Sequence, residues 1–178
     1  MTDPDLKLLR AAGQGDFQAF ELLVKRYQAP LLNFIARYIG DRFLAEEAAQ
    51  EVFLKVFRAA PRFEAKSKVS TWIFRIAYNQ AMTEIDRRGR HRDLCQTLSN
   101  GREGEEPFSM PGEVSELRHD VMSALSRLPE NQRAALLLRV NEELSYREIA
   151  DILGVSVESV ESLLFRARTN LKKYVDHR

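Results

Sequence analysis

The sequence predicts an all-α protein of two small helical domains, a helical bundle and a helix-turn-helix unit, joined by a flexible linker. Apolar residues recur at helical spacing along most of the 178 residues, and the sustained alternation typical of strands is absent. Residues 93–112 are instead rich in Gly, Pro, Ser and Glu without any period, which is the composition of a linker. We therefore expect one domain over residues 1–92 and another over residues 113–178.

Capping residues mark the helix boundaries of the first domain. Asp16 is placed to cap a helix that closes at Gly40, since Asp favours the position before a helix and Gly the position after it. Asp41 starts a second helix, and Pro61 ends it because proline lacks the amide hydrogen that a continuing helix needs. Both helices carry apolar positions at helical spacing and are expected to pack in one core.

A third helix is expected from Thr71 to about Gly89, with Ser70 as its cap. One of its faces is apolar, and another is polar at every fourth position. Water is the default partner of such a stripe, yet Asn reads adenine and Arg binds phosphate or guanine, so the helix is a candidate nucleic-acid surface. The stripe consists of Arg75, Asn79, Thr83 and Arg87, and Arg88 adds to a basic cluster at its end.

The loop before this helix adds side chains suited to a single nucleic-acid strand. An aromatic ring offers a platform for a splayed base, while cations and a hydroxyl suit the strand's backbone. The basic cluster at the end of the third helix would otherwise be a solvated helix end, but a second nucleic-acid feature downstream favours phosphate binding. The loop residues concerned are Phe63, Lys66, Ser67 and Lys68.

The second domain contains the stretch most informative about function, residues 145–170. Ser145 followed by Glu148 is a capping box at a helix start, and Gly154 suits the left-handed conformation that ends a helix. Ser156 is then placed to cap a second helix. This arrangement matches the helix-turn-helix, whose second helix enters the major groove of DNA. The alternative is a helical hairpin that serves stability alone.

The outward side of that second helix predicts its contacts with DNA. Phe165 suits a thymine methyl group, and Arg166 reaches phosphate or guanine. Glu161 is not expected to read a base, because phosphate repels a carboxylate that finds no cytosine amino group. The candidate contacts are Ser156, Ser159, Ser162, Phe165, Arg166 and Arg168.

Composition argues against several classes of protein. A net charge of +1 does not fit a histone-like polycation. No apolar run is long enough to span a bilayer and no signal peptide is recognisable, so we expect a cytoplasmic protein without membrane insertion. Cys95 is alone, which excludes an intramolecular disulfide and makes a zinc site unexpected. Catalytic motifs are missing as well, so we expect neither enzymatic activity nor a cofactor.

Four segments in this order resemble the bacterial sigma factors of the extracytoplasmic function (ECF) class, the minimal members of the primary sigma family. Two of them resemble the opening of sigma region 2, one its promoter-reading part and one sigma region 4. They are GDFQAFELLVKRY, DRFLAEEAAQEVFLKVFRAAPRF, FEAKSKVSTWIFRIAYNQAMTEIDRRGR and LPENQRAALLLRVNEELSYREIADILGVSVESVESLLFRARTNLKK.

The resemblance implies a noncatalytic factor that makes core RNA polymerase selective for promoters. Glu47, Gln50 and Glu51 would dock on the clamp helices of the β′ subunit, and region 4 would meet the β flap. The loop and the third helix would read the minus-ten element and trap its melted strand, while the helix from Ser156 would read the minus-thirty-five element. The class also implies control by an anti-sigma factor, often in a stress response.

Two other interpretations remain open from the residues alone. The chain could be a helix-turn-helix regulator that binds an operator duplex without polymerase, with residues 1–92 serving to sense or dimerise. It could also be a helical scaffold that uses its basic surfaces for protein partners. A regulator should bind its duplex alone with strong salt dependence, whereas a sigma factor needs core polymerase for specific binding.

Overall fold

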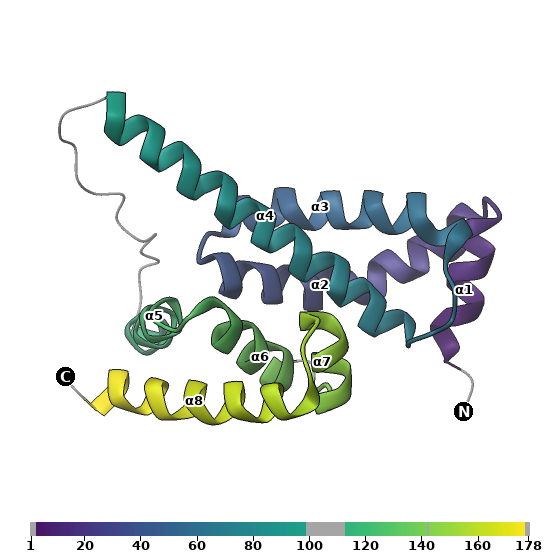
Figure 1. Cartoon of the computed structure of the whole chain (residues 1–178). Helices are drawn as coiled ribbons and strands as arrows, with labels where there is room; N and C mark the ends of the chain where they lie inside the picture. Colours follow the sequence, from purple (N-terminus) through teal and green to yellow (C-terminus); the bar gives the residue numbers. More distant parts are fainter. Residues whose placement is uncertain (1–2, 99–112, 142, 177–178) are drawn as a thin grey trace.

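All regular structure described in the computed structural model is helical, as the sequence predicts. The structure describes residues 3–98, 113–141 and 143–176, and no strand occurs among them. Figure 1 shows the helices packed in two neighbouring groups, with α4 as the long diagonal element. The elements are α1 (Pro4–Gly13), α2 (Phe17–Ile39), α3 (Arg42–Ala59), the 3-10 turn η1 (Ala60–Arg62), α4 (Val69–Leu98), α5 (Glu113–Ser126), α6 (Glu130–Asn141), α7 (Tyr146–Leu153) and α8 (Val157–Asp176).

Capping residues predicted for α2 and α3 are confirmed. The Asp16 carboxylate accepts hydrogen bonds from the Gln18 and Ala19 amides at 3.0 Å each. The Asp41 carboxylate accepts one from the Leu44 amide at 3.1 Å. Gly40 closes α2 in the left-handed conformation, with φ 79°, which side chains other than glycine disfavour.

The boundaries of α4 differ from the prediction at both ends. The helix begins at Val69, so Ser70 lies in its first turn and is not the residue before it. The Val69 amide instead donates to the Asp3 carboxylate at 2.7 Å, a long-range contact that local sequence cannot reveal. At the other end α4 runs past Gly89 to Leu98 and enters the expected linker, because one glycine inside a helix costs only about 1 kcal/mol. Residues 99–112 of that linker lie outside the described residues.

Helices α1 to α4 form an N-terminal bundle around large apolar side chains. The rings of Phe34 and Phe74 meet edge to face at 5.8 Å between centroids, and Leu31, Ile35 and Ile73 are fully buried beside them. Full burial of such side chains stabilises the fold by about 1.5–3 kcal/mol each.

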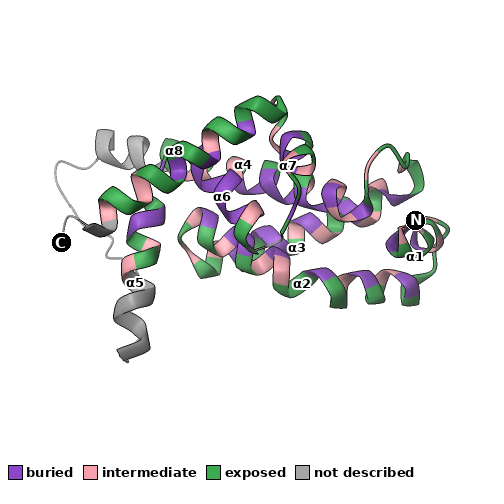
Figure 2. Cartoon of the chain, turned by 90° about the horizontal axis from the view of Figure 1, so that it is seen from below, coloured by how far each residue is buried: buried purple, intermediate pink, exposed green. Residues whose placement is uncertain are grey.

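Helices α5 to α8 form a C-terminal bundle that packs directly against the N-terminal one. Helix α6 lies against α2, and α7 lies against α4 (Figure 1). Figure 2 shows buried residues along α6 where it faces the N-terminal bundle, whereas the outer side of α8 is exposed. Leu138, Ile149 and Leu164 of the second bundle belong to the same apolar cluster as the core of the first. The two groups of helices therefore share one continuous core.

Candidate nucleic-acid interface

Helices α7 and α8 form the helix-turn-helix that the sequence predicts. The Ser145 hydroxyl accepts from the Glu148 amide at 3.3 Å, and the Glu148 carboxylate accepts from the Ser145 amide at 2.8 Å, which completes the capping box. Gly154 turns the chain with φ 68°. The Ser156 hydroxyl then caps α8 by accepting from the Ser159 amide at 3.2 Å.

Burial divides α8 into an inner and an outer face. Val160, Leu164 and Ala167 are at most 1% exposed and hold the helix against the rest of the bundle. Phe165 is 71% exposed, so this large apolar side chain is accessible on the outer face. All six predicted contact residues of α8 are exposed, and four side chains line a shallow hollow on this face: Glu161, Ser162, Phe165 and Arg166.

The first turn of α8 uses its polar groups internally. The Ser156 and Ser159 hydroxyls are hydrogen bonded to each other at 3.1 Å. Bonds from its own backbone amide and from Ser156 lower the pKa of the Glu158 carboxyl, so this group stays charged at the positive end of the helix. The outward side chains free of such local duties are therefore Ser162, Phe165, Arg166 and Arg168.

The loop between η1 and α4 holds the second set of predicted residues. Phe63 is half-buried and packs on Trp72 with 4.9 Å between ring centroids, so part of its ring serves the fold. Lys66 is exposed and pairs with Glu64, while Ser67 is half-buried. The loop therefore presents a packed aromatic ring beside an exposed cation that pairs with Glu64.

The polar stripe on α4 is exposed over most of its length. Asn79 and Thr83 face outward, and the Thr83 hydroxyl donates to the Asn79 carbonyl oxygen at 2.9 Å, which leaves the Asn79 amide group available. Further along, Arg87 pairs with Glu84 at 2.8 Å and Arg88 approaches Asp41 at 3.7 Å. The stripe residues thus lie on one surface, as expected from their spacing.

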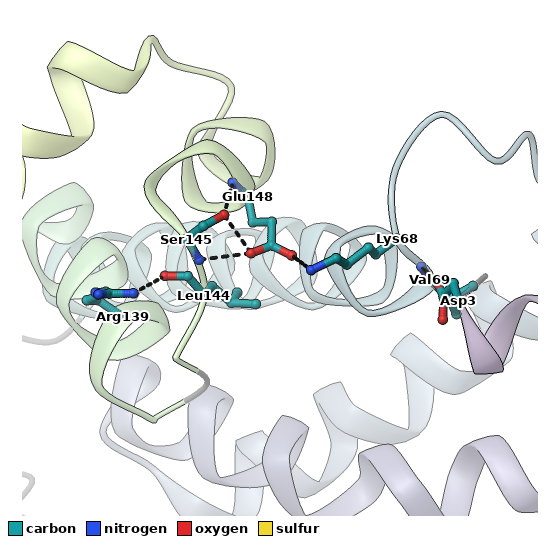
Figure 3. Close-up of polar contacts among 7 residues, drawn as sticks. All are labelled: Asp3, Lys68, Val69, Arg139, Leu144, Ser145 and Glu148. Carbon is teal, nitrogen blue, oxygen red and sulfur yellow. Dashed lines mark hydrogen bonds and ion pairs between the residues drawn. The ribbon is translucent and has the colours of Figure 1, made fainter. Parts of the chain in front are cut away.

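Two predicted contact residues are engaged by α7, and Figure 3 shows the first of them, Lys68. The Lys68 ammonium lies 2.8 Å from the Glu148 carboxylate, which is only 16% exposed. Arg75 Nε donates to the Asp151 carbonyl oxygen at 2.8 Å. Glu148 therefore serves both its own capping box and a contact with the loop. The sequence pattern reveals the first role but not the second, because the partner lies far away in the chain.

Protonation states support this ion pair. Burial acts to raise the pKa of Glu148, but hydrogen bonds from Lys68 and Ser145 outweigh it and lower the pKa below its usual range. The hydrogen bond and charge of Glu148 in turn raise the pKa of Lys68. Both groups are therefore charged at neutral pH.

A second set of contacts joins α2 and α4 to α6. The Tyr78 hydroxyl donates to the Asn131 side-chain oxygen at 3.1 Å. The Arg133 guanidinium lies 5.0 Å from the centroid of the Tyr38 ring, a cation–π contact in a buried setting. Burial raises the pKa of Tyr38, so its hydroxyl stays neutral. The contacts of Lys68 and Arg75 are thus part of an extended interface.

The outer face of α3 carries the third predicted set. Glu47 and Gln50 are exposed and Glu51 is half-exposed. Sequence reasoning missed that two large apolar residues flank them, Phe43 at 70% and Leu54 at 49% exposure. Their positions, four residues before Glu47 and four after Gln50, place all of them on one helix face. An outward apolar pair around polar groups is typical of a protein-docking surface.

Metal and membrane sites find no support in the part of the chain that the structure describes. No group of three or more potential metal ligands occurs there. None of the helices searched combines the length and apolar character needed to cross a bilayer.

Comparison with known proteins connects these surfaces to a family. The family description "Sigma-70 region 2" matches residues 23–91, and "Sigma-70, region 4" matches residues 118–171. The RNA polymerase sigma-H factor of Pseudomonas aeruginosa is 35% identical over 96% of this chain and 93% of that protein. The ECF RNA polymerase sigma-E factor of Escherichia coli is 35% identical over 92% of this chain and 90% of its own length.

Solved structures share the fold. CnrH in complex with the cytosolic domain of CnrY is 27% identical, with 97% of both chains covered and a TM-score of 0.72. The fold is also shared with RpoE of Bartonella quintana, solved in complex with the anti-sigma factor NepR, at 23% identity and a TM-score of 0.71 over 89% of this chain and 97% of that one. The chain belongs to the ECF RNA polymerase sigma factors, which direct promoter-specific transcription initiation by core RNA polymerase.

Proposed function

We propose that this sigma factor reads the minus-thirty-five element with the outer face of α8. The observation that carries the proposal is the division of α8, which buries Val160 and Leu164 while Phe165 and Arg166 face outward. A helix held in this way by a helix-turn-helix enters the major groove with its exposed side chains at base edges. Arg166 would supply a bidentate guanine or phosphate contact, and Phe165 an apolar contact with thymine.

The minus-ten element is assigned to the loop before α4 and to the polar stripe on α4. Flipping a base out of the duplex costs a few kcal/mol, which contacts with the single strand must offset. The Phe63 ring and the Asn79 amide offer stacking and hydrogen bonding for that strand. The cationic residues beside them, Lys66, Arg87 and Arg88, would attract its phosphates.

We expect α7 to leave the loop when the protein binds the minus-ten element. In the compact arrangement Lys68 pairs with Glu148 and Arg75 donates to the Asp151 carbonyl oxygen, so α7 competes with DNA phosphates for both side chains. We therefore assign the compact arrangement to the protein before it engages a promoter. A DNA phosphate would take the place of the Glu148 carboxylate as the partner of Lys68.

The exposed face of α3 is assigned to core polymerase. Phe43 and Leu54 supply apolar contact area, and Glu47 and Gln50 supply polar contacts around it. In this assignment α3 docks on the β′ clamp helices, and residues 113–178 meet the β flap. The family matches at residues 23–91 and 118–171 support a division into a domain over 1–92, a linker over 93–112 and a domain over 113–178.

Control by an anti-sigma factor in a stress response completes the proposal. Its support is the similarity to CnrH, which was solved in complex with the cytosolic domain of another protein. Promoters and RNA polymerase lie in the bacterial cytoplasm, so we assign the protein to that compartment. Within the sigma family it is a minimal relative of the primary sigma factors. The polymerase catalyses RNA synthesis, so in this proposal the factor itself needs no cofactor and is not an enzyme.

Run-off transcription tests the proposal. Purified core polymerase with this protein should transcribe a subset of a promoter-fragment library, and neither component alone should do so. The operator-binding alternative makes the opposite prediction, namely specific and salt-sensitive duplex binding by the protein alone.

A further inference from the structure

Helix α1 contacts the backbone at both ends of the loop that we assign to the minus-ten element. Its first end is Asp3, the N-cap of α1, whose carboxylate accepts from the Val69 amide at 2.7 Å. Val69 is the first residue of α4 and fully buried, so this bond fixes the place where the loop ends (Figure 3). The same carboxylate also accepts from the Asp5 amide at 3.0 Å.

The other end of α1 meets the start of the loop. A Cβ atom placed on Gly13 would lie 3.0 Å from the Ala60 carbonyl carbon and 3.1 Å from the Pro61 Cα. These two residues belong to η1, which leads directly into the loop. The absence of a side chain at Gly13 therefore allows α1 and η1 to approach closely.

Helix α1 is itself firmly anchored. Asp5 is 6% exposed and accepts hydrogen bonds from the Arg26 guanidinium and the Tyr27 hydroxyl of α2. Leu9 is fully buried in the shared core. Because α1 cannot shift without breaking these contacts, its two ends provide fixed points for the loop between them.

We propose that α1 acts as a brace that sets the conformation of the minus-ten loop, with Asp3 and Gly13 as positioning residues that never touch DNA. The proposal rests on the assigned role of the loop, and it extends promoter selectivity to residues outside the segments that match the sigma families. Residues 63–68 belong to no helix or strand. The positions of the two ends of this loop therefore constrain where Phe63, Lys66 and Lys68 lie.

The Asp3→Ser variant separates the two roles of Asp3, capping α1 and binding the Val69 amide. Serine is as good an N-cap as aspartate, so α1 keeps its start, but the shorter side chain cannot also reach the Val69 amide. Asp16→Ser is the matched control, because Asp16 caps α2 and has no bond to the loop. Gly13→Ala tests the other end, where the added methyl group must displace Ala60 or Pro61 while it favours the helix.

The test uses core polymerase and a promoter selected with the wild-type protein. Transcription from that promoter is compared with transcription from versions substituted in the minus-ten or the minus-thirty-five element. We expect Asp3→Ser to reduce the minus-ten preference by about two- to tenfold, the range of one lost hydrogen bond. The minus-thirty-five preference and the affinity for core polymerase should stay unchanged, and faster hydrogen exchange at the Val69 amide should accompany the loss. Gly13→Ala should reduce the same preference.

Two outcomes would overturn the brace. Asp3→Ser could behave like Asp16→Ser in every measurement, or it could weaken polymerase binding and both promoter preferences alike, as a general stabiliser would. Phe63→Ala, measured in parallel, reports on the proposed function separately. If that variant kept its full minus-ten preference, the loop would not be the reader, and both proposals would fall together.

Discussion

The two surfaces that we assign to promoter DNA differ in their availability. The outer face of α8 is accessible, with both Phe165 and Arg166 exposed. The end of the loop and the first turns of α4 are instead engaged, because α7 holds Lys68 and Arg75. We therefore propose an order of events in which the assigned minus-thirty-five surface is accessible in the compact protein, whereas the assigned minus-ten surface becomes fully available when α7 moves.

The largest effect is expected from removing the support of the open surface. Leu164→Ala deletes a side chain that is 1% exposed and should lower the free energy of unfolding by about 2–5 kcal/mol. Thermal and urea unfolding measure it, with Thr169→Ala on the exposed face as the control. Equal stability of the two variants would show that α8 is not held by its inner face.

Arg166→Ala tests recognition by the open surface itself. A lost bidentate base contact should weaken discrimination at the minus-thirty-five element by about 1–3 kcal/mol, with little change in stability because the side chain is exposed. Transcription on promoters substituted at that element measures the loss. If Arg168→Ala, used as the comparison, altered base preference and Arg166→Ala did not, the base reader would be reassigned to Arg168.

Asn79→Ala tests the second surface at a position that α7 leaves exposed. Loss of a hydrogen bond to the melted strand should reduce promoter opening by about 0.5–1.5 kcal/mol while initial binding of the closed promoter is kept. Permanganate reactivity of the melted strand and filter binding separate the two steps. Equal losses in both steps would contradict a role in trapping the strand.

Glu148→Gln tests the ion pair between Lys68 and Glu148, which is present at the assigned minus-ten surface. Glutamine preserves the capping box with Ser145 but removes the charge that holds Lys68, so the helix-turn-helix should remain intact. A partly exposed ion pair of this kind contributes up to about 1 kcal/mol, and we expect a measurable gain within that limit in binding of single-stranded minus-ten DNA in the presence of core polymerase. Unchanged binding at low salt would show that Lys68 does not exchange Glu148 for phosphate.

Sequence reasoning succeeded where the causes are local. The capping box of Ser145 and Glu148, the left-handed Gly154 and the cap at Ser156 all act within a few residues, and each is confirmed. The all-α class followed equally well from periodicity. The roles of the exposed residues in binding remain predictions.

The features that the sequence did not reveal depend on contacts between distant segments. Asp3 contacts Val69 across 66 positions, which is why Ser70 was the wrong residue for the start of α4. The pairing of Lys68 with Glu148 likewise depends on how α7 packs against α4, and no local pattern encodes that arrangement. The exposure of Phe43 and Leu54 depends on which face of α3 the other helices cover, and an apolar residue type alone does not indicate that face.

The most direct test measures the separation of α4 and α7 before and after promoter engagement. Cysteines at Asp86 and Arg147, in a Cys95→Ser background, carry two spin labels whose distance is read by pulsed electron resonance in the free protein and in the open complex with core polymerase. In the free protein we expect one narrow distance distribution, because α7 is held against α4, and in the complex a clearly longer mean distance. The same distance distribution in both states would contradict a departure of α7 from α4.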